Sequence, residues 1–521
     1  MPFDPTSLPR DPDRLIEIIV ALQDRNAHLE GMVAALKRTV YGPRSEKLLA
    51  ETAQLPLDLD DLTFSASSTA ANDDAVGPQP ARATSPRPTA ARNIGALPKH
   101  LPRYEVLMEP ESTACPCCGG TMHVIGEDVS EQLDVIPAVL RVRRMRRPRY
   151  GCRSCEGAVV QAKALPRLVE NGMATTALIT SIVVGKFAWH LPLNRQTDML
   201  RGQGIALDRS TLVHWVIRAA WWLKPLHTLL LGVVLAAPKV FCDDTPLPVL
   251  DRRRRRTRTA RFWSYAVDDR PWQGPARPAV VYLFAENRKG RHVHGHLTGF
   301  SGVLQVDGYA GYRELTKPSR PGGAVTLAYC LAHARRQFFE VYQKSQSTVA
   351  AAALQRIGAV YQIEERVRGL TSAQRGIVRQ SETKPILEAF KIWLMQRLAE
   401  ESAKSDLAKA IRYTLNHWNG LTVFLADGRV EVDSNIVERT IRPIALGRRN
   451  ALFAGSSRGA EAWAILASII NTAKLHDLDP QTYLADVLEK IVSGQTKVNA
   501  LHELLPWVWK EARSQQTAAA A

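Results

Sequence analysis

The N-terminal residues 12–41 carry a hydrophobic repeat of seven residues. Leucine fills one core position of each heptad, and β-branched residues with a single Asn fill the other: Leu15, Ile19, Leu22, Asn26, Leu29, Val33, Leu36 and Val40. This combination is typical of a parallel two-stranded coiled coil, so residues 1–50 are expected to hold a leucine-zipper-like element that pairs two protomers. The alternative is an amphipathic helix packed on its own chain, because Ile16, Ile18 and Val20 add further apolar positions.

The repeat is absent from residues 51–100. This stretch is rich in Ala, Ser, Thr and Pro and offers few apolar side chains that could be buried. Such a composition cannot offset the entropy that ordering costs, so we expect a disordered linker between the N-terminal helix and the domains that come after it.

Residues 166–236 are predicted to be helical and are rich in tryptophan. Within them, residues 193–220 suggest a helix, a turn that contains Gly, and a second helix. The spacing fits a helix-turn-helix DNA-binding domain that presents Arg209, Thr211 and His214 to a groove. It fits equally well a plain helical hairpin whose Trp side chains form a core.

Short, β-rich apolar runs begin at about residue 237. Turn residues or charged loops separate these runs, which lie at 239–244, 261–267, 279–285, 302–308 and 324–330. The first three suit hairpins and the last two flank a parallel crossover, an order that predicts a ribonuclease H-like mixed sheet with helices on both faces. Residues 334–425 carry only helical patterns and predict an all-helical insertion. The expected fold is therefore multidomain α/β, with this sheet domain at 237–455 and C-terminal helices at 456–521.

Acidic residues stand at informative places in this domain. Asp243 is expected to end the first strand and Asp307 the fourth, and these strands would be neighbours in the sheet. Glu438 flanks the apolar face of a later predicted helix and can point toward the same edge. Three converging carboxylates could hold a pair of divalent metal ions for phosphodiester chemistry. Asp244 could replace Asp243, since strand alternation does not decide between neighbours.

Other interpretations of these acids stay open. Glu431 and Asp433 have the same chemistry as Glu438 and lie close to it in the chain. Any single carboxylate is more commonly a solvated surface group than a ligand. The combination with strand ends is what favours a catalytic site.

The charge balance agrees with a polyanionic partner. The chain of 521 residues has a formal net charge of +17, and Lys and Arg side chains release counterions when they neutralise phosphates. A membrane surface or a ribosome would also suit a basic protein. We expect no membrane-spanning helix and no secretory signal, because no apolar run is long enough and the N-terminus lacks a basic region followed by an apolar one.

Seven cysteines point to a metal site, since five of them lie between residues 115 and 155. Two Cys-x-x-Cys pairs can each present two thiolates to one tetrahedral Zn²⁺: Cys115, Cys118, Cys152 and Cys155. Cys117 could substitute for Cys118, and four unrelated buried thiols are the alternative. A structural zinc domain is thus expected at 101–165, in a reducing compartment.

Arginine clusters provide candidate phosphate contacts. Six arginines crowd the stretch 141–149, and residues 252–261 should form a long hairpin tip that clamps phosphate. A solvated face or a mobile loop is the alternative for each cluster. The residues expected to bind DNA are Arg143, Arg144, Arg146, Arg147, Arg209, Arg253, Arg254, Arg255, Arg448 and Arg449.

Several long strings resemble those of the IS66 family of bacterial transposases. They include "DDTPLPVL", "LQVDGYAGY", "CLAHARRQFFE" and "VDSNIVERTIRPIALGRRNALFAGSSRGAEAWA", and the zinc knuckles and N-terminal helix match the family's layout as well. The resemblance covers nearly the whole chain. It implies an Asp–Asp–Glu (DDE) catalytic triad at Asp243, Asp307 and Glu438, although "Asp-Asp-Thr" stands here where many members read Asp-Glu-Thr.

The resemblance also implies partners and cofactors. Mg²⁺ or Mn²⁺ would occupy the catalytic site and Zn²⁺ the cysteine knuckles. The partners would be double-stranded DNA at the element's ends and at the target, a second protomer, and small accessory proteins of the same element. Activity would take place in the bacterial cytoplasm, at the nucleoid.

Further residues are implied as support for this site. Cys330 and His333 resemble the Cys-x-x-His element of some related transposases, with a buried structural pair as the alternative. Arg439 and Arg442 would neutralise phosphates together with Arg448 and Arg449. His292, His294 and His296 alternate like a metal-binding strand but are expected to be loop residues near DNA.

Two rival functions remain compatible with the sequence. A zipper and zinc DNA-binding regulator would carry the acids incidentally. A structure-specific nuclease of the same fold would cleave DNA without strand transfer.

Overall fold

The computed structural model describes residues 140–151, 159–251 and 253–520. The predicted coiled coil, the predicted linker and the cysteines proposed as zinc ligands lie outside these residues. The part of the chain from Arg143 onward forms one compact unit.

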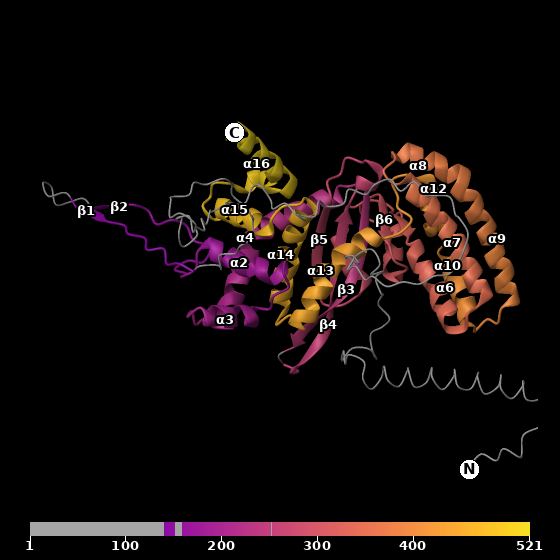
Figure 1. The fold of residues 1–521 in the computed structure, drawn as a ribbon, viewed down its shortest axis with the longest axis horizontal. Coiled ribbons are helices and arrows are strands. Elements are labelled where there is room, and N and C mark those ends of the chain that lie inside the picture. Colours follow the sequence, from indigo (N-terminus) through magenta and orange to yellow (C-terminus); the bar gives the residue numbers. More distant parts are fainter. Residues whose placement is uncertain (1–139, 152–158, 252, 521) are drawn as a thin grey trace, which may run out of the picture. The chain divides into compact units, whose positions relative to one another are not determined.

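The centre of this unit is a mixed sheet of five strands in the order β5-β4-β3-β6-β7 (Figure 1). β3, β4 and β5 are antiparallel neighbours, whereas β6 runs parallel to β3 and β7 parallel to β6. The predicted mixed sheet of hairpins followed by a parallel crossover is confirmed. The strands are β3 (Lys239–Asp251), β4 (Arg256–Val267), β5 (Ala279–Ala285), β6 (Val303–Val306) and β7 (Thr326–Tyr329).

β3 is longer than its sequence pattern indicates, because it continues through Pro246 and Pro248 to Asp251. Proline cannot donate a ladder hydrogen bond and therefore argues against a central strand. Here both prolines lie beyond the segment that pairs with β6, which ends at Phe241. The prediction that Asp243 ends the strand is wrong, since Asp243 lies inside β3.

Helices cover both faces of the sheet. Successive side chains of β4 point to opposite faces, and each face meets a different set of helices. Ser264 faces α13 (Asn435–Ala451), where its hydroxyl lies 3.0 Å from that of Thr440. The neighbouring Trp263 and Tyr265 face the other way, toward aromatic and His side chains of the second layer. That layer holds α5 (Gly290–His296) and η4 (Ala310–Thr316), and η3 (Arg270–Trp272) comes after β4.

The edge strand β5 is closed by α14 (Ser457–Leu475). The Ser468 hydroxyl accepts a hydrogen bond from the backbone N–H of Tyr282 (2.8 Å), and the Thr472 hydroxyl accepts one from Val280 (3.1 Å). Edge strands leave backbone donors unpaired. Two helix hydroxyls satisfy such donors here, which fixes α14 to the sheet.

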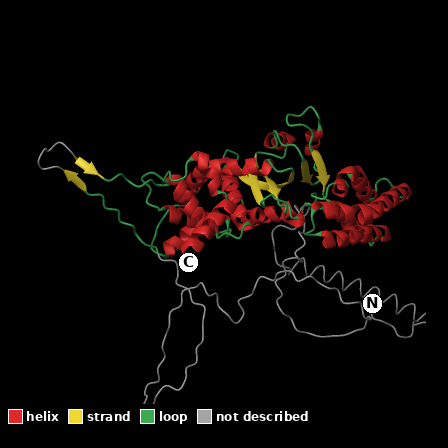
Figure 2. Ribbon diagram, turned by 90° about the horizontal axis from the view of Figure 1, so that it is seen from above, coloured by secondary structure: helices red, strands yellow, loops and turns green. Residues whose placement is uncertain are grey.

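A group of helices between β7 and α13 has its own hydrophobic core, which includes Phe338, Phe390 and Ile411. Figure 2 shows the strands of the central sheet with helices on either side of them. The helices of this group are α6 (Leu331–Ser345), α7 (Thr348–Val367), α8 (Ser372–Val378), the π-helix η5 (Arg379–Thr383), α9 (Lys384–Glu400), α10 (Asp406–Asn416), α11 (Trp418–Leu421) and α12 (Val423–Ala426).

Two buried arginines tie these helices to the segment that leads into α13. Arg379 pairs with Glu364 through two contacts of 2.8 and 2.6 Å and also donates to the carbonyl of Val430 (2.9 Å). Arg375 donates to Glu431 (2.8 Å). The start of α13 is therefore positioned by charge-assisted hydrogen bonds from outside the sheet.

The predicted helix, turn and helix at 193–220 correspond to α3 (Leu193–Gly202) and the start of α4 (Arg209–Leu235). Trp215 is buried, whereas Arg209 and His214 are exposed. DNA recognition by this pair thus stays a prediction. The helices that accompany it are α2 (Thr176–Phe187), α15 (Pro480–Val492), η6 (Val498–Leu504) and α16 (Pro506–Ala520).

The arginine-rich stretch 141–149 leads into a short antiparallel pair, β1 (Arg149–Gly151) and β2 (Val159–Gln161). The Arg147 side chain donates to the carbonyl of Ala162 (2.9 Å). Arg143, Arg144 and Arg146 are exposed. Among the described helices, none is both long and apolar enough to cross a membrane.

Acid should weaken the packing of α4 through His227. Burial lowers the pKa of this imidazole to about 4, although its contact with the Tyr282 carbonyl (3.2 Å) opposes the shift and Lys224 adds to it. An unfolded His has a pKa near about 6.5, so below that pH the unfolded chain gains a proton that the folded chain does not. Stability that is complete above about pH 6.5 is therefore lost as the pH falls toward about 4.

Urea unfolding of the wild type and His227→Gln, each at about pH 7.5 and about pH 5, measures this effect. We expect the variant to lose less stability between the two pH values than the wild type does. Equal losses would mean that His227 is not responsible.

Candidate active site

Parallel pairing of β3 with β6 places two of the predicted acids at one level of the sheet. The register aligns Phe241 with Gln305, so two residues further on Asp243 stands opposite Asp307, which directly follows β6. The Asp307 carboxylate accepts a hydrogen bond from the backbone N–H of Tyr309 (3.0 Å), which orients the side chain. The prediction that Asp307 follows a strand end agrees with this geometry.

Gly308 keeps this turn close to the helical group. A Cβ atom at this position would lie 2.7 Å from the Tyr413 hydroxyl, which is closer than real Cβ contacts come. The Asp-Gly sequence is thus a packing requirement as well as a turn.

Glu438 reaches the same place from α13. Its helix packs on β3 and β4 through Val437 and Ile444, and Glu438 itself is only 6% exposed. The Ser434 hydroxyl donates to Glu438 Oε1 (3.3 Å). A buried carboxylate on a helix that covers the sheet is the arrangement that the sequence predicted for this residue.

The neighbouring acids act electrostatically on Asp243. Burial raises the pKa of Asp243 well above the usual carboxyl range, and the nearby charges of Asp307, Asp244 and Glu438 raise it further. Among the described residues, no Lys or Arg side chain pairs with Asp243. The charges of Asp307 and Glu438 thus act on Asp243, which has no cationic partner of its own among the described residues.

Asp244 is in a different position, although it is the next residue along β3. Its carboxylate pairs with Arg261 (3.0 Å) and with Arg288 (2.9 Å), and Arg288 also approaches Asp307 Oδ2 (3.4 Å). Burial raises the pKa of Asp244, while these two guanidinium groups oppose that shift. Because its oxygens are engaged, Asp244 suits a positioning role better than a metal-binding one.

The sequence pattern does not identify Arg288 as a partner of the acids. Arg261 belongs both to the predicted hairpin tip at 252–261 and to the predicted strand at 261–267, and the structure places it in β4 with its side chain only 18% exposed. The tip itself is shorter, because β4 already begins at Arg256. Arg288 follows β5 at no recognisable spacing, so nothing in the sequence marks it as a partner of the acids.

The competing acids Glu431 and Asp433 have structural partners. Glu431 is paired with Arg375 (2.8 Å). Asp433 accepts hydrogen bonds from the backbone (3.1 Å) and side-chain (2.9 Å) nitrogens of Asn435 at the start of α13. Burial raises the pKa of Asp433 to about 6, and Glu431 and Glu438 contribute to that shift. Both acids support the helix that carries Glu438.

Cys330 and His333 lie beside Glu438, at the junction of β7 and α6. His333 Nδ1 is 4.0 Å from Glu438 Oε1, and the thiol of Cys330 accepts from the backbone N–H of Ser434 (3.3 Å). Burial, with the nearby charges of Asp433 and Glu438, raises the pKa of the Cys330 thiol to about 12. Both residues border the acidic cluster, as their sequence motif suggested.

The His residues at 292, 294 and 296 form neither a strand nor a loop. They lie in the short helix α5, where His296 Nδ1 is hydrogen-bonded to the Tyr265 hydroxyl (2.9 Å). His292 contacts Asn287 (3.0 Å) and His294 the carbonyl of Gly311 (3.1 Å). Turn-like residues around them, such as Gly290 and Gly295, concealed this helix in the sequence.

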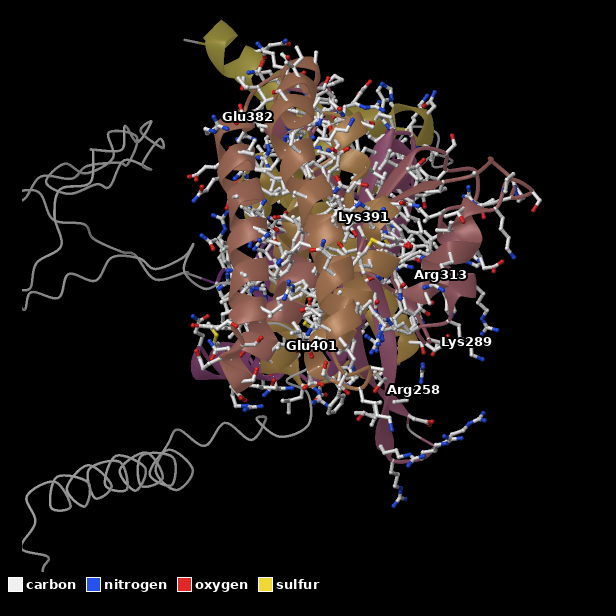
Figure 3. The ribbon with its side chains drawn as sticks, turned by 90° about the vertical axis from the view of Figure 1, so that its right-hand side faces the viewer. Arg258, Lys289, Arg313, Glu382, Lys391 and Glu401 are labelled. Carbon is white, nitrogen blue, oxygen red and sulfur yellow. The ribbon has the colours of Figure 1, made fainter. Side chains whose placement is uncertain are left out.

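Several elements of this unit carry basic side chains. Arg448 donates to the Thr245 hydroxyl (3.3 Å) on β3, whereas Arg439, Arg449 and the hairpin arginines Arg253, Arg254 and Arg255 are exposed and Arg442 is half-buried. Figure 3 shows Arg258, Lys289 and Arg313 at one edge of the unit, while Glu382, Lys391 and Glu401 mark the mixed charge of the outer helices.

The acidic cluster fits divalent metal ions. Its donors are carboxylate oxygens, which Mg²⁺ and Mn²⁺ prefer. Burial is the main cause of the raised pKa of Asp243, and repulsion from the neighbouring carboxylates adds to it. A divalent cation would relieve that repulsion. The residues available for such ions are Asp243, Asp307 and Glu438.

Family models match most of the chain. The model described as "Transposase IS66 family" matches residues 171–462, which is more than half of the sequence. Shorter models match 112–156 ("zinc-finger binding domain of transposase IS66"), 468–507 ("IS66 C-terminal element") and 28–106 ("Transposase C of IS166 homeodomain").

Full-length relatives occur in Sinorhizobium fredii (strain NBRC 101917 / NGR234). The uncharacterized protein y4jD is 50% identical over 507 residues, which cover 96% of this chain and 97% of the relative. The uncharacterized protein y4hP is 37% identical over 504 residues, which cover 93% of this chain and 89% of the relative.

Proposed function

The chain belongs to the IS66 family of DDE transposases, with that family's leucine-zipper, zinc-finger and C-terminal elements, and we propose that it cleaves and joins DNA at the ends of its own insertion sequence. The observation that carries this proposal is the cluster of Asp243, Asp307 and Glu438 on adjacent elements, with Asp243 lacking a cationic partner among the described residues. Strand cleavage would free a 3′-hydroxyl, and the same site would activate that hydroxyl against target DNA.

In this proposal Asp243, Asp307 and Glu438 hold two Mg²⁺ or Mn²⁺ ions in a ribonuclease H-like domain. When bound, such a pair activates the attacking oxygen and stabilises the leaving oxygen. Arg288 bridges Asp244 and Asp307, so it keeps the Asp307 carboxylate turned toward β3. Cys330 and His333 would line the site beside Glu438, where His333 Nδ1 lies 4.0 Å from Glu438 Oε1.

DNA binding is assigned to basic segments around this site. Arg439, Arg442, Arg448 and Arg449 on α13 would neutralise phosphates near the cleaved bond, and Arg253–Arg255 at the hairpin tip would hold flanking DNA. The stretch at 143–147 and the start of α4 with Arg209 would contact the terminal repeats. Zn²⁺ on Cys115, Cys118, Cys152 and Cys155 would stabilise the finger.

We divide the chain into functional segments accordingly. Residues 1–50 would pair two protomers so that both ends are held together, and 51–100 would link them to the zinc domain at 101–165. The helices at 166–236 would bind DNA, 237–455 would catalyse with the insertion at about 334–425, and 456–521 would support the sheet. Accessory proteins of the same element would complete the assembly.

The proposed chemistry requires a divalent metal, and purified protein tests it. We expect a labelled duplex that carries the element's end to be cleaved and joined to target DNA with Mg²⁺ or Mn²⁺, and to be bound but unchanged in the presence of EDTA. Gel analysis separates cleaved from joined strands. Cleavage without joining would indicate a nuclease, and binding without either would indicate a regulator.

A further inference from the structure

A sulfur, a nitrogen and an oxygen donor meet beside the acidic cluster. Cys330 Sγ, a ring nitrogen of His333 and a carboxylate oxygen of Glu438 all lie within 4.8 Å of one another. Cys330 precedes α6 and His333 lies in its first turn, whereas Glu438 comes from α13. The start of α6 is joined to the segment before α13 by the hydrogen bond that Leu331 N–H donates to the Val432 carbonyl (3.0 Å). Two elements far apart in the chain therefore build one small group of metal-binding atoms.

The side chains of these three residues do not hydrogen-bond to one another. His333 Nδ1 is buried and has no hydrogen-bond partner among the described residues, since Glu438 Oε1 at 4.0 Å is too distant. Cys330 is 2% exposed and Glu438 6%, so water has little access to either. A buried polar atom without a partner is costly and calls for an explanation. A ligand between these three side chains supplies one.

We propose that Cys330, His333 and Glu438 form a binding site for a thiophilic divalent cation of the Zn²⁺ class. Zn²⁺ takes Cys, His and carboxylate ligands at about 2.0–2.3 Å, which puts neighbouring ligands roughly 3.5 Å apart in a tetrahedral site. The observed separations of up to 4.8 Å would contract by about 1 Å, within the reach of side-chain rotation. Three protein ligands leave one position for water, and the Cys330 thiol releases its proton to solvent on binding.

Magnesium cannot compete well for this site. Thiolate and imidazole ligands select zinc and related metals, whereas Mg²⁺ prefers oxygen. The two kinds of metal are therefore separated by ligand chemistry although both would use Glu438.

Sharing Glu438 gives the site a consequence for catalysis, and this step rests on the proposed function. A Zn²⁺ ion held by Cys330 and His333 would take the Glu438 carboxylate away from the ions on Asp243 and Asp307. Zinc would then inhibit strand cleavage even in excess Mg²⁺. The site is distinct from the cysteine knuckles, because none of their cysteines takes part.

Zinc binding to the full-length protein tests the site directly. With the N-terminal cysteines already saturated, Zn²⁺ is titrated in competition with a chromophoric chelator into the wild type, Cys330→Ser and His333→Gln. We expect a further site in the wild type whose affinity falls at least about tenfold in each variant. Cys242→Ser is the matched control, because Cys242 is the other buried free cysteine among the described residues and bonds Tyr312 instead. That variant should keep the site.

Melting temperatures measured with and without Zn²⁺ guard against misfolding, since zinc should raise the value in the wild type and in Cys242→Ser alone. Equal zinc affinity in the wild type, Cys330→Ser and His333→Gln would overturn the site.

A second experiment tests whether bound Zn²⁺ takes Glu438 away from the catalytic metal ions. Zinc inhibition of cleavage is measured in excess Mg²⁺, and each protein is compared with its own rate without zinc. We expect the inhibitory zinc concentration to rise at least about tenfold in Cys330→Ser. Equal zinc inhibition of the wild type and Cys330→Ser would show that Zn²⁺ on this site does not compete for Glu438. If no protein cleaves DNA, the proposed function fails, while the binding titration still decides the metal site.

Discussion

Glu438→Gln is expected to lower the rates of strand cleavage and strand transfer by at least about a thousandfold, which corresponds to about 4 kcal/mol of transition-state stabilisation. The substitution keeps the size of the side chain and an oxygen that can accept from the Ser434 hydroxyl. It removes the charge that a metal ligand supplies. Because Glu438 is buried on α13, its loss should leave the affinity for the element's ends within about threefold. A gel-based cleavage assay and a binding titration with the same duplex measure the two quantities.

Glu461→Gln provides the matched control for this experiment. Glu461 lies exposed on α14, so the same chemical change there should alter neither quantity. Cleavage by Glu438→Gln at the control's rate would show that Glu438 is not part of the catalytic site.

Asp243→Asn and Asp244→Asn should have opposite kinds of effect, although the two residues are neighbours. Asp243→Asn should abolish cleavage by a similar factor of about a thousand. It should not destabilise the metal-free protein, because it removes a buried charge that neighbouring carboxylates repel. Asp244→Asn should instead cost about 2 kcal/mol of stability, since it leaves Arg261 and Arg288 without their anion. The figure is modest because Arg288 is 39% exposed and water screens it.

Urea unfolding in EDTA, combined with the cleavage assay in Mg²⁺, distinguishes the two variants. If Asp243→Asn lost stability while Asp244→Asn kept it, Asp244 would replace Asp243 as the first acid of the triad. Full catalytic activity of Asp243→Asn would also rule out Asp243 as that acid.

The sequence predicted the order of strands and the position of Asp307, because short apolar runs and a following Asp-Gly turn are local signals. The extent of β3 was not predictable from the same signals. Pro246 and Pro248 argue locally against a strand, and they are tolerated only because β6 ends before them. That condition depends on the length of a different strand, β6, which begins at Val303, 55 residues after Pro248.

The choice between Asp243 and Asp244 shows a second limit of sequence reasoning. Alternation tells that neighbouring side chains face opposite sides of a strand but not which side holds the site. Our preference for Asp243 rests on Arg261 of β4 and Arg288 after β5, which meet at Asp244 through tertiary packing. Similarly, the Cys-x-x-His motif is visible in the sequence, whereas its approach to Glu438 depends on how α6 and α13 pack.

The central claim is that Asp243, Asp307 and Glu438 form one site for strand transfer. Mobilisation in cells tests it most directly, with a marked element bounded by the gene's own flanking repeats and supplied with wild-type protein, Asp243→Asn, Asp307→Asn or Glu438→Gln at equal levels. We predict movement with the wild type and none with any of the three variants. Movement at the wild-type frequency with any one of them would contradict the claim.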